Sequence, residues 1–154
     1  MKITYKGDYA LKALFRLALG YGGPDGGMLS ISEIAKFGDM PTKFLEQILL
    51  ALRRQGLVKS RRGVQGGFLL AKDPKDITIG EVIRLVEGPI EPIACVEKGA
   101  YTRCKDIQSC IFRDVWREVR DAISVVVDTV TFEELVLRYK ERSLRAGSVY
   151  EYSI

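Results

Sequence analysis

The sequence predicts a mainly α-helical protein, with a winged helix-turn-helix that includes a small two-stranded wing and a long helix near the C-terminus. Three observations indicate this fold class. Two short helical segments, a basic turn and a glycine-broken hairpin follow one another between residues 30 and 70. Apolar residues recur with helical spacing in the segments on either side. This order of elements places one helix in a DNA groove and a hairpin beside it.

Length and composition restrict the class of protein. The chain of 154 residues suffices for one domain, or for a small domain with a dimerisation element. An apolar share of 47% supports a packed core and excludes a disordered chain. No apolar run approaches the ~18 residues of a membrane span, and charges interrupt the segment where a secretory signal would be apolar. We therefore expect a cytoplasmic protein.

Basic residues gather in the predicted DNA-reading region, although the net charge of the whole chain is only +4. Two acidic residues of this region, Asp39 and Glu46, stand against seven basic ones: Lys36, Lys43, Arg53, Arg54, Lys59, Arg61 and Arg62. Such clustering is expected of a surface that faces phosphates. The alternative is a solvated helix face beside an ordinary charged hairpin, and the order of the elements favours DNA binding.

Two helices are expected before the DNA-reading helix. The spacing of apolar residues predicts the first over residues 6–21, where Gly7 or Asp8 can start it and a glycine-rich run ends it. Ser30 and Glu33 have the spacing of a capping box, which opens a short second helix over residues 31–37.

A third helix is expected to read the DNA. Pro41 suits its first position, and Gly56 follows its predicted end at about Gln55. Its apolar face consists of Leu45, Ile48, Leu49 and Leu52. Its exposed N-terminal half offers Thr42, Lys43, Glu46 and Gln47 to base edges and phosphates. Glu46 can accept a hydrogen bond from a cytosine amino group, and the alternative is a salt bridge to Lys43 or Lys36.

The wing should follow this helix directly. Residues 57–60 and 67–71 are predicted to form its two strands, with a flexible basic tip over residues 61–66. Arg61 or Arg62 can enter a minor groove, where narrow width concentrates negative potential. The predicted DNA contacts from the helix end and the wing are Arg53, Lys59, Arg61, Arg62 and Gly63.

Three more helices are expected in the C-terminal half. A second capping-box pair, Thr78 and Glu81, starts a helix that runs to about Glu87. Apolar periodicity predicts a long helix over residues 111–128, although the β-branched run 125–127 locally favours a strand. Its apolar side consists of Phe112, Val115, Trp116, Val119, Ala122, Ile123 and Val126. Thr131 and Glu134 cap a last short helix, and the polar tail after Arg142 should be loosely ordered.

Three cysteines lie in a polar, glycine-containing segment before the long helix, at Cys95, Cys104 and Cys110. In a reducing compartment, an odd set of this kind indicates metal binding, redox activity or buried thiols rather than a disulfide framework. The polar surroundings favour thiolate ligation of an iron–sulfur cluster or zinc over three buried thiols. The chain has no histidine. This excludes imidazole ligands and histidine-dependent catalysis, so we predict that the protein is not an enzyme.

Four segments together resemble the IscR/NsrR/CymR family of bacterial winged-helix transcription regulators, the Rrf type. They are GDYALKAL, FLEQILLALRRQGLVKSRRGVQGGFLL, ITIGEVIRLVEG and FRDVWREV. The resemblance covers roughly residues 1–138, and the second segment is the most specific. It implies a homodimer that is held by the long helix and binds a pseudo-palindromic operator in double-stranded DNA, because two modules related by a twofold axis read two half-sites.

The resemblance also implies a use for the cysteines, because members with three cysteines in this loop usually ligate an iron–sulfur cluster (2Fe–2S or 4Fe–4S). In the cluster-assembly regulators the fourth ligand is a histidine three residues after the last cysteine, where this chain has Arg113. In the nitric-oxide-sensing relatives it is an aspartate of the other subunit, near the N-terminus, and Asp8 stands at the matching position. The preferred ligand set is therefore Cys95, Cys104, Cys110 and Asp8.

Alternatives remain open for these ligands. Asp8 also suits the N-cap of the first helix. The alternative fourth ligands are Asp106, Asp114, Glu97 and a small exogenous thiol. Eight residues separate the first two cysteines, more than is typical of the family, whereas the five between the second and third match it.

The sequence thus predicts a homodimeric DNA-binding repressor controlled by an iron–sulfur cluster. One rival is a regulator of the same fold that senses thiol oxidation or binds zinc, and another is an iron–sulfur or redox protein that does not bind DNA. The expected divisions are a winged helix-turn-helix domain over residues 1–88, a cysteine loop over 89–110, a dimerisation helix with a short C-terminal helix over 111–142, and a tail over 143–154.

Overall fold

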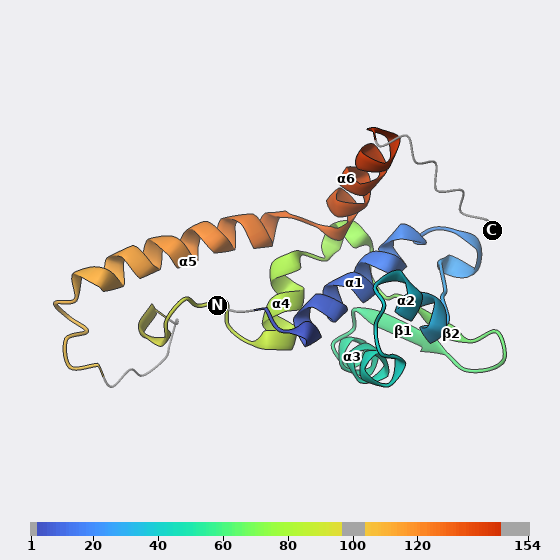
Figure 1. Ribbon diagram of the computed structural model, residues 1–154, viewed down its shortest axis with the longest axis horizontal. Coiled ribbons are helices and arrows are strands. Elements are labelled where there is room, and N and C mark those ends of the chain that lie inside the picture. The colour runs from blue at the N-terminus through green and yellow to red at the C-terminus, as the bar shows by residue number, and fades with distance from the viewer. Residues whose placement is uncertain (1–2, 97–103, 146–154) are drawn as a thin grey trace.

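The computed structural model describes residues 3–96 and 104–145 (Figure 1). Its helices are α1 (Tyr5–Leu19), α2 (Ile31–Phe37), α3 (Thr42–Arg54), α4 (Ile79–Glu87), α5 (Ile111–Thr129) and α6 (Phe132–Arg145). Strands β1 (Val58–Arg61) and β2 (Gly67–Leu70) form an antiparallel hairpin, and short 3-10 turns occur at η1 (Pro24–Gly26), η2 (Pro74–Asp76) and η3 (Ala94–Val96). The predicted mainly α-helical fold with a small two-stranded wing is confirmed.

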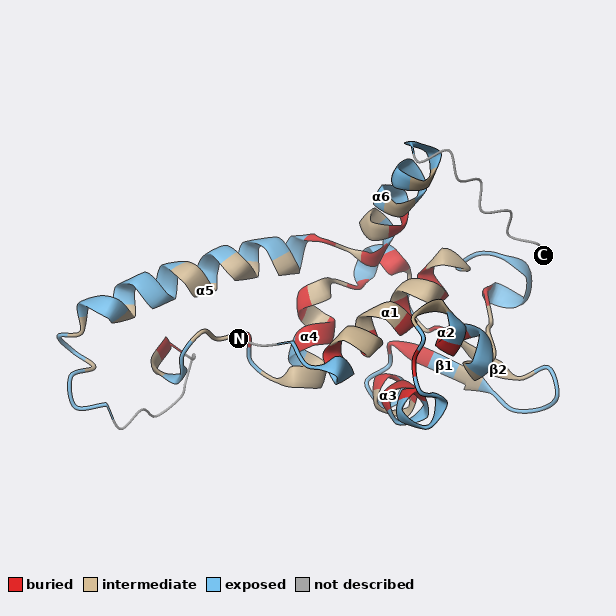
Figure 2. Ribbon diagram, in the orientation of Figure 1, coloured by how far each residue is buried: buried red, intermediate tan, exposed pale blue. Residues whose placement is uncertain are grey.

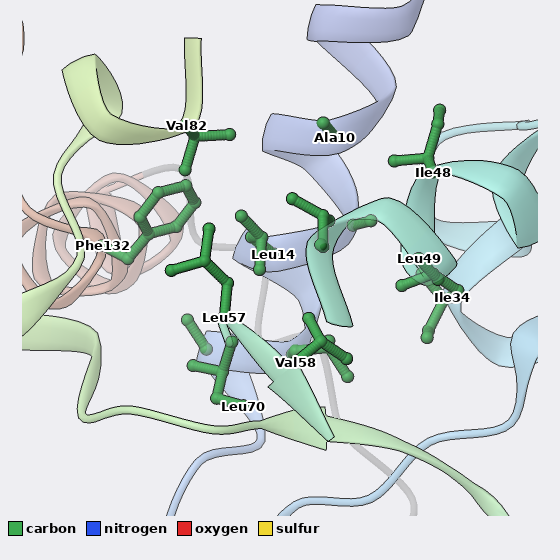
Figure 3. Close-up of a cluster of buried hydrophobic side chains, with 14 of the residues drawn as sticks. Ala10, Leu14, Ile34, Ile48, Leu49, Leu57, Val58, Leu70, Val82 and Phe132 are labelled. Atoms are coloured by element: carbon green, nitrogen blue, oxygen red, sulfur yellow. The ribbon is translucent and has the colours of Figure 1, made fainter. Parts of the chain in front are cut away.

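Helix α1 lies at the centre of the hydrophobic core. Ala10, Leu14 and Leu17 of this helix are buried in one cluster with the apolar faces of α2 and α3 and with residues of the hairpin (Figure 3). Phe132 and Val136 of α6 belong to the same cluster. The C-terminal helix therefore packs back onto the winged helix-turn-helix, which local sequence patterns did not indicate.

The capping box at the start of α2 is present as predicted. The Ser30 hydroxyl oxygen accepts from the Glu33 amide at 3.3 Å, and the Glu33 carboxylate accepts from the Ser30 amide at 2.8 Å. The Ser30 hydroxyl also donates to the Glu33 carboxylate at 2.6 Å, and this hydrogen bond, together with the one from the Ser30 amide, holds the pKa of Glu33 below its ordinary value. The start of α2 is thus determined by residues only three positions apart.

The start of α1 differs from the prediction. Thr4 is its N-cap, and Glu87 at the end of α4 accepts from the Thr4 hydroxyl at 2.6 Å and from the Thr4 and Gly7 amides at 3.0 Å. The expectation that Gly7 or Asp8 starts the helix is wrong, because a carboxylate 80 or more positions along the chain accepts from these amides. The helix also ends two residues early, at Leu19. Hydrogen bonding from Thr4 lowers the pKa of Glu87.

Helix α5 is attached to the rest of the molecule near its C-terminal end. Arg84 of α4 donates two hydrogen bonds to Asp128, at 2.5 and 2.9 Å, and these lower the pKa of Asp128. Backbone hydrogen bonds from Ile79 to Val130 and from Phe132 to Ile77, at 3.1 and 3.0 Å, join the segment before α4 to the segment after α5. From this junction α5 extends away from the helical body (Figure 1).

The remaining boundaries agree with the sequence to within a few residues. The β-branched run 125–127 is helical, as apolar periodicity predicted. Thr131 accepts from the Glu134 amide at 3.2 Å at the start of α6, as expected. This helix is longer than predicted, because it includes the first three residues of the expected tail, and residues 146–154 lie outside the described part.

None of the helices in the described ranges 3–96 and 104–145 is both long enough and apolar enough to cross a membrane.

Candidate DNA-binding surface and cysteine loop

All nine residues that the sequence proposed as DNA contacts are exposed. Four lie on α3, and a fifth is near its end: Thr42, Lys43, Glu46, Gln47 and Arg53. The others lie on β1 and in the turn that follows it: Lys59, Arg61, Arg62 and Gly63. The structure thus places them on two adjacent elements, helix α3 and the wing (Figure 1).

The orientation of α3 follows from its apolar face. Leu45, Ile48, Leu49 and Leu52 are all buried, as predicted, and they pack against α1 and α2 in the core. The rings of Tyr9 on α1 and Phe44 on α3 also meet edge to face, with a centroid distance of 5.9 Å. Because one face of α3 is held in this way, its opposite face is presented to solvent.

Arg53 has a structural partner that the sequence did not indicate. Its guanidinium donates to the Ser60 hydroxyl at 2.8 Å, which joins the end of α3 to strand β1. Arg53 therefore helps to set the position of the wing relative to α3. A contact with a phosphate would use the donors that this hydrogen bond leaves free.

The turn at the tip of the wing contains a glycine in a conformation that other residues rarely adopt. Gly63 has a φ of +116°, a conformation that L side chains rarely adopt. The Arg61 guanidinium donates across the turn to the Gln65 carbonyl at 3.5 Å, and Val64 is fully exposed. Strands β1 and β2 are in the register Lys59–Leu69 and Arg61–Gly67. The basic side chains of the wing are thus carried by a short, tightly turned hairpin.

Glu46 does not form the salt bridges that were considered for it. Within the described ranges, its carboxylate is not paired with Lys43 or with Lys36. The alternative to base contact that the sequence suggested is therefore wrong for this structure, and the carboxylate is exposed on α3.

The three cysteines lie in and around the loop that joins α4 to α5. Cys95 is half-buried in η3, Cys104 is exposed, and Cys110 is half-buried at the N-cap position of α5. All three are free thiols. In the part of the chain that the structure describes, no three Cys, Asp or Glu side chains are grouped in a way that could hold a metal ion. The predicted ligand set is therefore not assembled within this single chain.

Asp8 is not the N-cap of α1, so that interpretation is wrong. Its carboxylate lies in the first turn and accepts from Lys12 at 2.7 Å, with its side chain 44% exposed. Of the substitutes considered, Asp106 is exposed, and Asp114 pairs with Arg117 at 3.3 Å. Glu97 lies outside the described residues.

Two arginines of α5 contact the cysteine loop, and sequence reasoning missed their role. Arg113 donates to the carbonyl oxygens of Cys95 and Ile107, at 3.2 and 3.5 Å. Arg120 donates to the carbonyl oxygen of Val96 at 2.7 Å. Their seven-residue separation, which puts both on one helix face, was the one available signal. Nothing in the local pattern named their partners.

Sequence comparisons find relatives over most of the chain. Residues 3–138 match the family model Rrf2, which is described as an iron-dependent transcriptional regulator. An rrf2-like helix-turn-helix-type regulator of Rhodobacter capsulatus is 42% identical over 87% of this chain and 91% of its own length. The regulator CymR of Bacillus subtilis is 38% identical over 88% of this chain and 89% of its own.

Solved structures with a similar fold include regulators of the same kind. The structure described as CymR, the global cysteine regulator of B. subtilis, has a TM-score of 0.74 at 36% identity and covers 90% of this chain and 98% of its own. The structure of T. potens IscR has a TM-score of 0.72 at 32% identity and covers 92% of this chain and 90% of its own.

Proposed function

Because the chain belongs to the Rrf2 family of helix-turn-helix transcriptional regulators, we propose that it is a homodimeric repressor whose affinity for a pseudo-palindromic operator depends on an iron–sulfur cluster. It is a regulator and not an enzyme, as the sequence predicted. The observation that carries the proposal is the combination of an exposed basic helix and wing with three free thiols on a loop beside α5.

DNA reading is assigned to α3 and the wing. Thr42, Glu46 and Gln47 are exposed on the N-terminal half of α3, where a recognition helix meets base edges. Lys43 and Arg62, one on each element, are exposed and have no ion pair within the described ranges. They are therefore the best candidates for contacts with phosphates that do not depend on sequence.

A double variant, Lys43→Ala with Arg62→Ala, is expected to weaken binding to a fluorescein-labelled duplex of mixed sequence. If each side chain neutralises one phosphate, the slope of log affinity against log salt should become shallower by about 2. Fluorescence anisotropy over a salt series measures this slope. The matched control, Lys140→Ala with Arg142→Ala, removes the same charge from exposed positions of α6 and should leave the slope nearly unchanged. Equal slopes for wild type and the first variant would show that these elements do not face DNA.

We assign the contact between the two copies of the homodimer to the long helix α5. No residue of α5, the whole of which is described, is buried in the single chain (Figure 2). Large apolar side chains are exposed along it, including Ile111 at 75% and Val126 at 60%. An apolar face of this length on a regulator indicates a protein interface, since solvent exposure of such a face is unfavourable. A second copy related by twofold symmetry would cover it and provide the second reading head.

The donor set fits an iron–sulfur cluster in its chemistry. Cys95, Cys104 and Cys110 are free thiols on one loop, and thiolates are the usual ligands of such clusters. A bound cluster supplies a group that oxidants or nitric oxide can alter. Asp8 of the other subunit is the proposed fourth ligand, because its carboxylate is partly accessible and, among the described residues, is held only by a half-exposed ion pair with Lys12. Ligation by these residues would order the loop, and DNA affinity would follow the relative stability of the ordered and unordered arrangements.

A second candidate keeps the DNA-binding function but replaces the cluster by thiol oxidation or zinc. It is supported by the same three free thiols, one of which is exposed, and by the similarity to CymR, one structure of which, from Staphylococcus aureus, is described as an oxidised form. An iron–sulfur protein that does not bind DNA is not favoured, because the chain belongs to a family of transcriptional regulators.

Anaerobic purification should yield a brown protein with stoichiometric iron and acid-labile sulfide, and Asp8→Ala should lower this content or alter the visible absorption spectrum. The matched control is Lys12→Ala, which removes the same ion pair but leaves the proposed ligand in place, and it should retain the wild-type spectrum. A wild-type spectrum in Asp8→Ala would mean that Asp8 is not a ligand of the cluster. A colourless wild-type protein would contradict the cluster and favour zinc or thiol oxidation.

A further inference from the structure

Two arginine side chains of α5 donate hydrogen bonds to the backbone of the cysteine loop. The Arg113 guanidinium donates from Nε to the Cys95 carbonyl oxygen at 3.2 Å and from Nη1 to that of Ile107 at 3.5 Å. The Arg120 guanidinium donates from Nη1 to the carbonyl oxygen of Val96 at 2.7 Å. Two neighbouring carbonyls, of Cys95 and Val96, are thus held by one face of α5.

The positions of these contacts bring both ends of the loop together. Arg113 lies one helical turn after Cys110, which is the N-cap of α5. Because its head group also contacts Cys95, the backbone of Cys95 is held near the end of α5 that Cys110 begins. The contact with Ile107 ties the second flank of the loop to the same guanidinium. The Arg113 side chain therefore joins the two flanks of the loop.

The hydrogen bond from Arg120 is largely shielded from solvent. Its side chain is only 15% exposed, and Val96, whose carbonyl it contacts, is buried. Asp121 accepts from its Nε at 2.8 Å and thereby fixes the direction of the guanidinium. Removing such a donor would leave a sheltered carbonyl oxygen without its partner, which is unfavourable.

Arginine is suited to this role in a way that lysine is not. The guanidinium is a planar fork with five donors and can serve two carbonyl oxygens at once, whereas an ammonium group is a compact point charge on a flexible stem. Arg113 uses two of its nitrogens for two different parts of the backbone. A lysine at this position would keep the charge but could not readily hold both flanks.

We propose that Arg113 and Arg120 are positioning residues of the cysteine site: they fix the backbone at Cys95 beside the Cys110 end of α5 before any ligand binds. The inference rests on the proposed function in assigning a ligand to these thiols. Fourteen residues separate Cys95 from Cys110, and a loop of this length would otherwise lose conformational entropy when it closes around a ligand. The two arginines reduce that loss by holding the flanks of the loop at Cys95 and Ile107 against α5.

The first test measures the thiols without any cluster. Reduced, metal-free, full-length protein is alkylated with iodoacetamide, and the rate at each cysteine is followed by mass spectrometry. In Arg113→Ala the rate at Cys95 should rise roughly three- to tenfold, as expected for the loss of charge-assisted hydrogen bonds, while the rate at exposed Cys104 should not change. Arg113→Lys should fall between this variant and wild type.

The matched control is Arg117→Ala. This arginine lies one turn further along α5, is exposed, and pairs only with Asp114 within the described residues. It should leave all three alkylation rates at their wild-type values. Wild-type rates at Cys95 in both Arg113→Ala and Arg120→Ala would overturn the proposal. So would an equal rise in Arg117→Ala, which would indicate general loosening of the helix.

A second readout uses Cd²⁺ alone as the probe, through the absorption of its thiolate complex. Replacement of Arg113 by alanine should weaken Cd²⁺ binding about 10- to 100-fold, the usual effect of removing a group that orients metal ligands. Unchanged affinity would overturn the preorganising role. The proposed iron–sulfur function is tested separately by iron and sulfide content. A wild-type protein that lacks both but shows the Arg113 effects on alkylation and Cd²⁺ binding would contradict the cluster and support the positioning role.

Discussion

Replacing Phe132 with alanine is expected to lower the free energy of unfolding by about 3–5 kcal/mol, the range for deleting a fully buried aromatic ring. Phe132 begins α6 and is 1% exposed. Figure 3 shows its ring in the core beside Val82 and Leu57. The change would leave a cavity where α6 meets α4 and α1, so it should also loosen the attachment of α6.

Urea denaturation followed by circular dichroism measures this effect, at several protein concentrations because subunit association contributes to stability. Leu137→Ala is the control on the same helix, because Leu137 is 55% exposed, and it should change stability by no more than about 0.5 kcal/mol. Equal stabilities for the two variants would mean that α6 does not belong to the core of the winged helix-turn-helix.

Gly67→Ala is expected to destabilise the protein by about 1–3 kcal/mol, the usual cost of forcing extra volume into a packed site, and to weaken duplex binding. A Cβ at this position would overlap the carbonyl oxygen of Leu29 and lie 2.8 Å from its carbonyl carbon, and backbone atoms cannot rotate aside. Leu29 and Phe68 exchange backbone hydrogen bonds at 2.9 and 2.8 Å, which brace β2 from the side opposite β1. The substitution therefore displaces the wing.

The measurements are urea denaturation and anisotropy with the same labelled duplex. Gly20→Ala is the matched control, because a Cβ there meets only ordinary van der Waals contacts and its φ of −93° suits any residue. It should leave both quantities near wild type. If Gly67→Ala bound DNA with wild-type affinity in spite of lower stability, the position of the wing would be unimportant for DNA binding.

Local patterns were sufficient for most helices and for the buried face of α3. The capping box at Ser30 and Glu33 and the apolar positions of α3 involve residues within two helical turns of one another, so short-range spacing already specifies them. The exposure of the predicted DNA-contacting residues follows from the same periodicity. Their contact with DNA and the ligation of Cys95, Cys104, Cys110 and Asp8 remain predictions.

Other features depend on contacts between distant parts of the chain. Glu87 determines where α1 begins, although 83 positions separate it from Thr4. In the same way, Phe132 returns α6 to the core, and Arg113 joins Cys95 to α5. Glu87 accepts from backbone amides of another element, Phe132 fills space between other elements, and Arg113 donates to carbonyl oxygens of another segment. Helical periodicity indicates which face of a helix is apolar, whereas its partner is decided only when the elements pack together.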